Sequence, residues 1–540
     1  MADKSATASA PSSSIASHPF NLDSADLIIR ASDNVDFLVH QATLAIASPV
    51  FATMLQLPQP EAALEASSSR PLVTVSEDSK TLDSLLRLCY PVVKRGMTDV
   101  EETASILRTA MKYEMEWPIS FLSSKLTNAA VNQPLRVWAI ACRLSLDNVA
   151  RSAANYLTPI SAFLTGRRPA TLHDLVGSVG LATLSGVTAG QYARLCQWYC
   201  QDQVTLGFSF VHPQRGPRRP APTNAASLDG HPQFTSDIPD CDVICRSRDA
   251  VDFEAHMNIL AIHSPVLKRR FFNLSSEPAQ ATPPTSSDRG LQTHRSLPVV
   301  AFQAGSHALA TILKICYGES NDNLPAPDLP VLAEALATID EYEMKQARAV
   351  VERLWDGLAQ RQPLVAYFAA TRYGLTSAAR AAAKLTLVLP PLPSAALYCS
   401  VMEDAPARSY HQLIAYRRAC EKAVTTALGK AQEARKEHLR TGAGSASTSR
   451  PNTFTFGQDP NRVPQEDWLV AYMRKVERDI ASSTIGRLGT MFEFSALIKE
   501  VQSCNDVWSW TNASLEQLAK VAQILPNQLA AAIDEVELEL

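Results

Sequence analysis

The sequence lacks the marks of a membrane protein, a secreted protein or a nucleic-acid binder. No apolar run approaches the roughly 18 residues that a membrane helix needs. Residues 1–20 have no hydrophobic core of the kind that directs secretion. The formal net charge is −4, whereas dedicated nucleic-acid binders usually carry a basic face. We therefore expect an intracellular protein, in the cytoplasm and/or the nucleus, with no membrane partner and no direct nucleic-acid binding.

Cysteine is sparse and scattered, with 10 residues in a chain of 540. The close pairs are Cys196-x3-Cys200 and Cys241-x3-Cys245. A zinc site needs two such pairs to converge, usually with His or Cys at fixed offsets. Small buried thiols in a reducing compartment are the simpler interpretation. The sequence thus predicts neither a disulfide framework nor a metal site.

Catalytic and cofactor motifs are also missing. The sequence contains no P-loop, no glycine-rich dinucleotide turn after a strand, no zinc-protease helix and no G-x-S-x-G elbow. We expect no enzyme activity, no catalytic residues and no cofactor.

What the sequence does contain is a long internal repeat. Residues 26–50 and 242–266 match at 14 of 25 positions without a gap, including Val-Asp-Phe, Leu-Ala-Ile and Ser-Pro-Val. Leu-Arg-Leu-Cys-Tyr at 86–90 is matched by Leu-Lys-Ile-Cys-Tyr at 313–317. Gln-Pro-Leu at 133–135 recurs at 362–364, in segments rich in Ala and Leu. A repeat of this strength indicates one structural unit used twice.

Local patterns predict the secondary structure of the first copy. Residues 25–30 and 35–39 form an apolar strand pair around the turn residues Ser32, Asp33 and Asn34. Ser48-Pro49 is typical of a helix N-cap followed by its first residue. A third strand at 71–75 and an amphipathic helix at 79–90 follow.

The strand pair followed by Phe37-x2-His40-x3-Leu44-x3-Ser48-x2-Phe51 resembles the BTB/POZ domain. The second copy keeps this pattern except that Leu267 replaces the last phenylalanine. With its helical segments and C-terminal region, the chain is similar to the BTB proteins of mushroom-forming fungi. The resemblance implies an α+β fold with two BTB/POZ-like modules, each a small sheet capped by helices and followed by a helical extension, plus a helical C-terminal tail.

These patterns predict eight segments. They are 1–20, disordered; 21–130, the first BTB/POZ-like domain; 131–202, helical extension 1; 203–236, a disordered linker rich in Pro, Gly and Ser; 237–361, the second BTB/POZ-like domain; 362–440, helical extension 2; 441–464, a flexible linker; and 465–540, a helical C-terminal region.

The resemblance implies a function in protein–protein interaction, because BTB domains dimerise and serve as scaffolds. Two copies in one chain suggest a BTB pair, formed either within one chain or between chains. Many BTB domains also bind cullin-3 as substrate adaptors of ubiquitin ligases, and this is our alternative, although no kelch or MATH substrate module follows. A transcriptional regulator is a weaker interpretation, since zinc-finger spacing is missing.

We predict that the association surfaces include apolar residues of the helix after Ser48 and of its repeat. A core position for these side chains is a competing interpretation. The residues are Val50, Phe51, Met54, Leu55, Val266, Leu267, Phe271 and Phe272.

Two polar patterns recur in both copies. His40 and His256 have no nucleophile or carboxylate partner at a fixed spacing, so we interpret them as structural. The acid pairs Asp33/Asp36 and Asp249/Asp252 lie at hairpin turns, where Asp commonly bonds the backbone.

Overall fold

The computed structural model describes most of the chain, in twelve stretches. These are residues 14–56, 70–157, 172–200, 208–213, 234, 240–276, 297–318, 328–392, 397–443, 468–482, 491–503 and 512–540. The chain divides into two compact units, Met1–Val187 with Arg194–Gln214, and Thr188–Ala193 with Arg215–Leu540.

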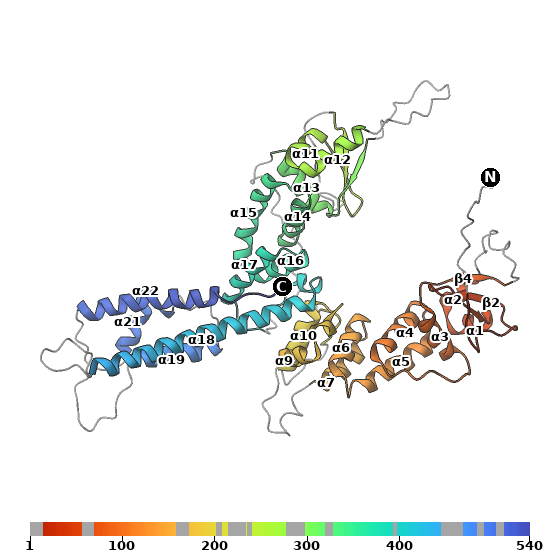
Figure 1. The fold of residues 1–540 in the computed structure, drawn as a ribbon, viewed down its shortest axis with the longest axis horizontal. Coiled ribbons are helices and arrows are strands. Elements are labelled where there is room, and N and C mark those ends of the chain that lie inside the picture. Colours follow the sequence, from red (N-terminus) through yellow and green to blue (C-terminus); the bar gives the residue numbers. More distant parts are fainter. Residues whose placement is uncertain are drawn as a thin grey trace, which may run out of the picture. The chain divides into compact units, whose positions relative to one another are not determined.

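The first unit begins with a mixed α+β module, which we call module 1. Its elements are β1 (Ser14–Ile15), β2 (Leu27–Arg30), β3 (Val35–Val39), α1 (Gln41–Ala47), α2 (Pro49–Met54), β4 (Leu72–Thr74), α3 (Ser79–Cys89), α4 (Val100–Lys112) and α5 (Glu116–Ala129). The sheet order is β1-β3-β2-β4, with β2 antiparallel to β3 and parallel to β4. Figure 1 shows the helices gathered beside this small sheet. The predicted strand pair, third strand and helix are confirmed.

Module 2, in the second unit, repeats this arrangement. Its elements are β5 (Val243–Arg246), β6 (Asp252–Ala255), α11 (Met257–His263), α12 (Pro265–Ser276), β7 (Val299–Ala301), α13 (Ser306–Cys316), α14 (Leu329–Glu341) and α15 (Lys345–Arg361). The sheet order β6-β5-β7 has the same pairing senses as β3-β2-β4. Asn34 and Ala250 occupy the same left-handed turn position, with φ of 60° and 61°. The repeat in sequence is therefore a repeat in structure.

Each module is followed by a set of helices, which we call extension 1 and extension 2. Extension 1 contains α6 (Pro134–Arg143), α7 (Asp147–Asn155), α9 (Leu172–Val179), η2 (Leu181–Leu184) and α10 (Ala189–Cys200). Extension 2 contains α16 (Pro363–Arg372), α17 (Thr376–Leu385), η3 (Thr386–Val388), η5 (Ser400–Glu403) and α18 (Ala407–Ala443). Proline is the first residue of both α6 and α16, where its missing N–H costs nothing.

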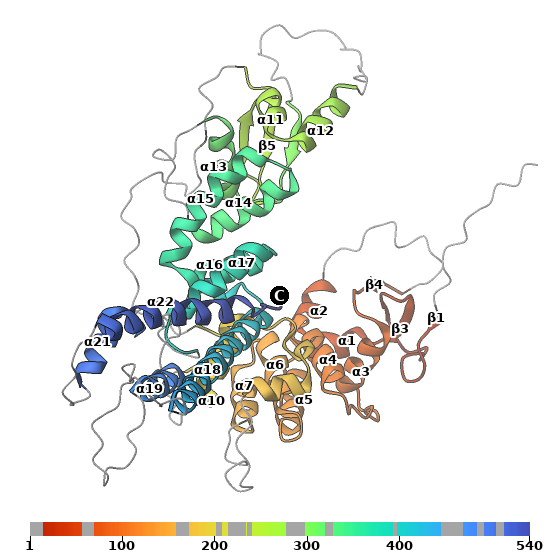
Figure 2. The same ribbon diagram turned by 60° about the vertical axis from the view of Figure 1, so that its left-hand side comes forward.

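The C-terminal region of the second unit is helical, as the sequence predicts. It contains α19 (Trp468–Ser482), α21 (Phe494–Ser503) and α22 (Asn512–Asp534). Helices α19 and α22 both pack against the long α18, with Val424, Leu428, Val476 and Leu529 buried among them. Both views show α19 and α22 running along α18 (Figures 1 and 2).

Two segments that we expected to be disordered are ordered in part. Within residues 1–20, β1 pairs in parallel with β3, and the side chain of Phe20 is 0% exposed. Phe20 packs edge-on against Tyr90, and in module 2 Phe234 packs in the same way against Tyr317. Within the 203–236 linker, Phe208, Phe210 and Val211 are also buried. The expectation of disorder was wrong for these residues, because buried aromatic side chains together with hydrogen bonds to neighbouring elements hold these short segments on the folded surface.

Candidate interaction surfaces

The acid pairs of both hairpins have structural partners. Asp33 accepts hydrogen bonds from the backbone N–H and hydroxyl of Ser79, at 3.1 and 2.6 Å. Asp249 accepts the equivalent bonds from Ser306, at 2.8 and 2.6 Å. Burial alone would raise the pKa of Asp249, but hydrogen bonds from Ser306, Ser247 and the backbone outweigh burial and lower this pKa to about 2. The other acid of each pair, Asp36 or Asp252, forms a two-pronged ion pair with an arginine of the neighbouring strand. Asp33 and Asp249 thus tie each hairpin to the start of α3 or α13, whereas Asp36 and Asp252 tie the two strands of the hairpin together.

The two histidines belong to a second repeated contact. The backbone N–H of His40 donates to the hydroxyl of Tyr90 at 2.8 Å, and His256 does the same to Tyr317 at 2.8 Å. Nδ1 of His256 also lies 2.7 Å from that hydroxyl. These contacts join the start of the first helix to the end of the third, which agrees with the structural interpretation of both histidines.

Serine caps the second helix in both modules. The hydroxyl of Ser48 accepts from the backbone N–H of Phe51 at 3.1 Å and donates to the carbonyl of Tyr113 at 2.5 Å. Ser264 makes the same two contacts, with Leu267 at 3.1 Å and Tyr342 at 2.7 Å. The capped helix is therefore fixed to the module core, and one face of its first turn points inward.

This geometry sorts the apolar residues that we predicted for association. Phe51, Leu267 and Phe271 are buried in their own modules, so they cannot form a free surface; Phe51, for example, stacks on Tyr113 with ring centroids 4.7 Å apart. For these three the core interpretation holds. Phe272 is 74% exposed. The remaining four are half-buried: Val50, Met54, Leu55 and Val266.

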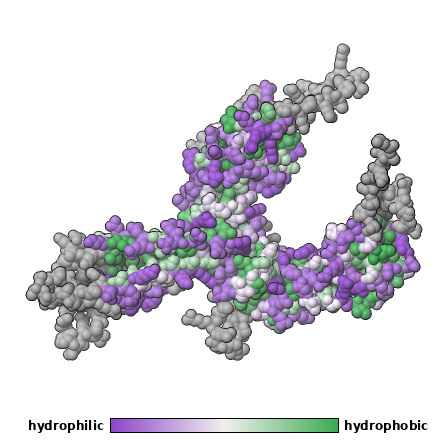
Figure 3. All heavy atoms as spheres, in the orientation of Figure 1, coloured by the Kyte–Doolittle hydropathy of each residue, from purple (hydrophilic) through white to green (hydrophobic). Residues whose placement is uncertain are grey.

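Sequence reasoning missed the large hydrophobic residue that is most exposed among the described residues of each module. Ile46 at the end of α1 is 88% exposed, and Ile262, at the same repeat position in α11, is 77% exposed. Both belong to the retained Leu-Ala-Ile-x-Ser-Pro-Val sequence, so a signal was available. Figure 3 shows hydrophobic residues at the surface over α1 and α2 and also over α11 and α12. Ile46 and Val50 form one such surface in module 1, and Ile262 and Val266 form the other in module 2. We call them the paired apolar surfaces because their residues occupy the same positions of the repeat.

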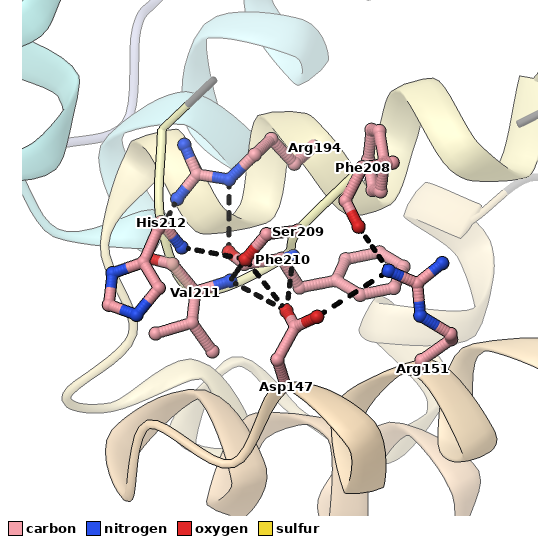
Figure 4. Close-up of polar contacts among 8 residues, drawn as sticks. All are labelled: Asp147, Arg151, Arg194, Phe208, Ser209, Phe210, Val211 and His212. Carbon is pink, nitrogen blue, oxygen red and sulfur yellow. Dashed lines mark hydrogen bonds and ion pairs between the residues drawn. The ribbon is translucent and has the colours of Figure 1, made fainter. Parts of the chain in front are cut away.

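A second feature lies entirely within the first unit, where the segment Phe208–Val211 docks on extension 1. One carboxylate oxygen of Asp147, the first residue of α7, accepts from the Ser209 hydroxyl at 2.8 Å and from the N–H groups of Phe210 and Val211 at 2.7 and 3.3 Å. Arg194 of α10 donates from Nε to the carbonyl of Phe210 at 2.9 Å. Figure 4 shows Asp147 and Arg194 approaching the segment from different helices.

Aromatic packing completes this docking. The ring of Phe210 is fully buried, 6.2 Å edge-on from Trp138 and 5.2 Å from Trp198 between ring centroids. Arg151 donates to the carbonyl of Phe208. Burial alone would raise the pKa of Asp147, but the hydrogen bonds from the docked segment and the charge of Arg151 outweigh it and lower this pKa. The docked segment therefore favours the ionised carboxylate.

Two buried cysteines of module 2 have thiols of low reactivity. Cys245 and Cys316 are buried thiols, and burial raises the pKa of each to about 12, which suppresses the thiolate that attacks or binds metal. Over the part of the chain that the structure describes, no group of three or more His, Cys, Asp or Glu side chains is arranged to hold a metal ion. No helix in the same part is long and apolar enough to cross a membrane.

Comparison with known proteins agrees with the fold. No curated protein matches the chain significantly. The BTB/POZ domain family matches residues 19–129 and 232–356, which span most of module 1 and most of module 2. The fungal resemblance stays a prediction. The chain thus carries two segments that match the BTB/POZ domain, a protein-interaction module, and this match supports a general role in protein–protein interaction.

Proposed function

We propose that the protein is a scaffold whose two BTB/POZ-like modules associate through the paired apolar surfaces, either with each other in one chain or with modules of another chain. The observation that carries this proposal is the exposure of Ile46 and Ile262 at the same position of the repeat. Burying one isoleucine side chain contributes about 1.5–3 kcal/mol. A single exposed apolar residue is ordinary. Here, however, the same residue is exposed at the same place in two diverged copies, and this recurrence supports an interface.

The test combines substitution with a mass measurement. Ile46→Asp and Ile262→Asp, singly and together, are compared with the wild-type chain by light scattering across a dilution series. Val131→Asp is the matched control, because Val131 is 58% exposed and lies outside both matched segments. Amide hydrogen exchange of α1 and α11 is measured on the same samples.

Pairing between chains predicts a wild-type dimer that either substitution dissociates. Pairing within one chain predicts a monomer at every concentration, in which Ile46→Asp speeds exchange in α11 and Ile262→Asp speeds exchange in α1. If neither the mass nor the exchange of the unsubstituted module changes, the surfaces do not pair and the proposal fails.

A second candidate function is that of a cullin-3 substrate adaptor. It rests on the BTB/POZ match and on the packed helical pair that follows each module, α6 with α7 and α16 with α17. Purified cullin-3 and the full-length chain are mixed and their complex is measured by light scattering. A complex that survives Ile46→Asp and Ile262→Asp would separate cullin binding from module pairing, and no complex at any tested concentration would exclude the adaptor.

A further inference from the structure

The first residues of α10 belong to the second unit, where they contact the segment that leads into α18. Thr188–Ala193 is assigned to that unit together with Arg215–Leu540. The two helix starts are copies of each other, because both begin with Ala-x2-Tyr-x2-Leu, at residues 189–195 and 407–413. A short 3-10 helix precedes each of them, η2 before α10 and η5 before α18. We call the contact of Thr188–Ala193 with residues 398–411 the α10–α18 contact.

This contact joins residues at equivalent positions of the repeat. Thr188 and Pro406, each of which directly precedes its helix, form an antiparallel bridge. The rings of Tyr192 and Tyr410, each the fourth residue of its helix, pack edge-on with their centroids 6.0 Å apart. A residue that contacts its own counterpart is the mark of an isologous interface, in which the same surface of two copies pairs about a local two-fold axis. Two independent pairs of this kind indicate a self-complementary surface.

The α10–α18 contact is packed and its polar groups have partners. The first N–H groups of an α-helix have no acceptor within the helix. In α10 the N–H of Ala189, the first residue, donates to the carbonyl of Ala405 at 2.8 Å. The hydroxyl of Tyr192 lies 3.1 Å from Nδ1 of His411. All four of these residues are buried. The contact therefore has the character of a protein interior.

One position of the contact favours the pairing of unlike copies. Glu403 accepts hydrogen bonds from the hydroxyls of Thr188 at 3.3 Å and Tyr398 at 3.1 Å. Its carboxylate lies beside Gly190, and a Cβ added to Gly190 would overlap that carboxylate. The counterpart of Gly190 in α18 is Arg408. Two α18 starts could not pair in the same way, because the Cβ of Arg408 would occupy the space that the Glu403 carboxylate needs.

We propose that the starts of α10 and α18 form a self-complementary association surface, through which extension 1 and extension 2 bind each other independently of the paired apolar surfaces of the modules. The partner of each helix start is its diverged copy. Gly190 and Glu403 select the unlike copy over a second α18 start. The residues before the linker are thereby held to those after it by a contact in which the modules take no part.

The test cuts the full-length chain between its two copies. A protease site is inserted after Pro220, cleavage is verified on a denaturing gel, and the mass of the cut protein is measured by light scattering across a dilution series. The two pieces should stay together in the wild-type chain. They should also stay together when Ile46→Asp and Ile262→Asp are both present, because the proposed contact does not use the modules.

Gly190→Glu should raise the dissociation constant of the two pieces about tenfold, because the new side chain overlaps and repels the Glu403 carboxylate. An acidic residue in the first turn favours the α10 helix itself, so the loss is not explained by unfolding of that helix. Gly357→Glu is the matched control, since Gly357 is an exposed residue of α15 and an added Cβ there meets nothing within 4 Å. Adding Glu403→Arg to Gly190→Glu should restore the affinity through an ion pair.

Amide hydrogen exchange at Ala189 in the uncut chain gives a second readout. It should be fast in Gly190→Glu and slow again once Glu403→Arg is added. Wild-type pieces that separate after cleavage would overturn the proposal, and so would a Gly190→Glu chain with unchanged affinity and unchanged exchange. Pieces that separate only with Ile46→Asp and Ile262→Asp would also overturn it and would leave the pairing of the modules as the association that holds the chain.

Discussion

The two modules keep the same polar contacts at equivalent atoms. The two extensions differ, because a pair of charged residues in extension 1 is matched by neutral residues in extension 2. In the modules, the Asp–Ser, His–Tyr and Ser–Tyr contacts recur within a few tenths of an ångström. In the extensions, Asp147 at the start of α7 corresponds to Thr376 at the start of α17, and Arg194, the sixth residue of α10, corresponds to Gln412, the sixth residue of α18. Thr376 and Gln412 line a cavity of about 270 Å³. The modules therefore retain their internal framework, whereas the extensions differ in the side chains at these two positions.

Extension 2 uses a buried arginine from another position. Arg417 of α18 donates to the carbonyls of Thr386, Leu389 and Pro390 at 2.8, 2.8 and 2.9 Å. Burial lowers the pKa of this guanidinium. A buried arginine thus satisfies the carbonyls of a returning segment in both extensions, but the segments and the helix positions differ. The following predictions, from the largest effect to the smallest, test how far the copies differ.

Truncating Phe210, the buried aromatic residue of the docked segment, should have the largest effect on stability. Phe210→Ala removes a fully buried ring and leaves a cavity beside Trp138 and Trp198, which costs about 3–5 kcal/mol. Exchange of the Val211 amide hydrogen should become fast, and the melting temperature of the chain should fall. Phe272→Ala, at a 74% exposed phenylalanine, is the control and should change neither quantity.

Removing the carboxylate of Asp147 should show that the two extensions differ. Asp147→Ala leaves two backbone N–H groups and one hydroxyl without their acceptor and should weaken segment docking by about 2–3 kcal/mol. Thr376→Ala, the equivalent change in extension 2, should have little effect on stability. Exchange of the Phe210 amide hydrogen measures segment docking in Asp147→Ala, and the melting temperature measures the stability of both variants. Equal destabilisation by Asp147→Ala and Thr376→Ala would contradict the divergence of the extensions.

The hairpin ion pairs should differ in strength because their exposure differs. The Asp36 side chain is 10% exposed and that of Asp252 is 42% exposed, although both bind an arginine at two points. Asp36→Asn should cost about 1–2 kcal/mol in local stability, because a partly buried arginine loses its charged partner. Asp252→Asn should be close to neutral. Amide hydrogen exchange in β2 and β3 measures the effect of Asp36→Asn, and exchange in β5 and β6 measures the effect of Asp252→Asn.

Acid should release the docked segment, with the smallest effect. The pKa of Asp147 is lower in the folded chain than its usual value near 3.8, so its contribution to stability is fully present above that value. The contribution is lost as pH falls through the folded pKa. Exchange at Phe210, corrected for the intrinsic rate at each pH, should therefore rise as the pH falls below about 3.8. Asp147→Asn should show no such rise; a rise of the same size in this variant would assign the effect to another group.

Much of the module fold could be predicted from the sequence, because its signals are local. Ser48-Pro49 and Ser264-Pro265 begin helices by capping chemistry, and the apolar runs around Asp33 and Asp249 form hairpins. The repeat made the second module predictable from the first. The candidate surface was harder to predict, because Phe51 and Ile46 lie five residues apart and look alike in hydropathy, and only packing against Tyr113 decides that the first is buried.

The linker shows why composition misleads. Residues 203–236 are rich in Pro, Gly and Ser, and that composition predicts a chain that cannot form a core of its own. Phe208–Val211 needs no core of its own, because extension 1 supplies the tryptophans, the carboxylate and the arginine that receive it. Those partners lie up to 72 residues away, between Trp138 and Phe210, so no local pattern indicates the contact.

By itself, the sequence determined the two copies, their strands and helix starts and the helical nature of the rest, since backbone capping, turn chemistry and apolar periodicity act over a few residues. Tertiary structure alone decided which apolar side chains remain at the surface, that the linker docks through Phe210, and that Leu540 lies at a cavity lined by residues of α17 and α18. Burial and hydrogen-bond partners depend on segments that are distant in the sequence, and those contacts exist only once the helices of each extension have packed.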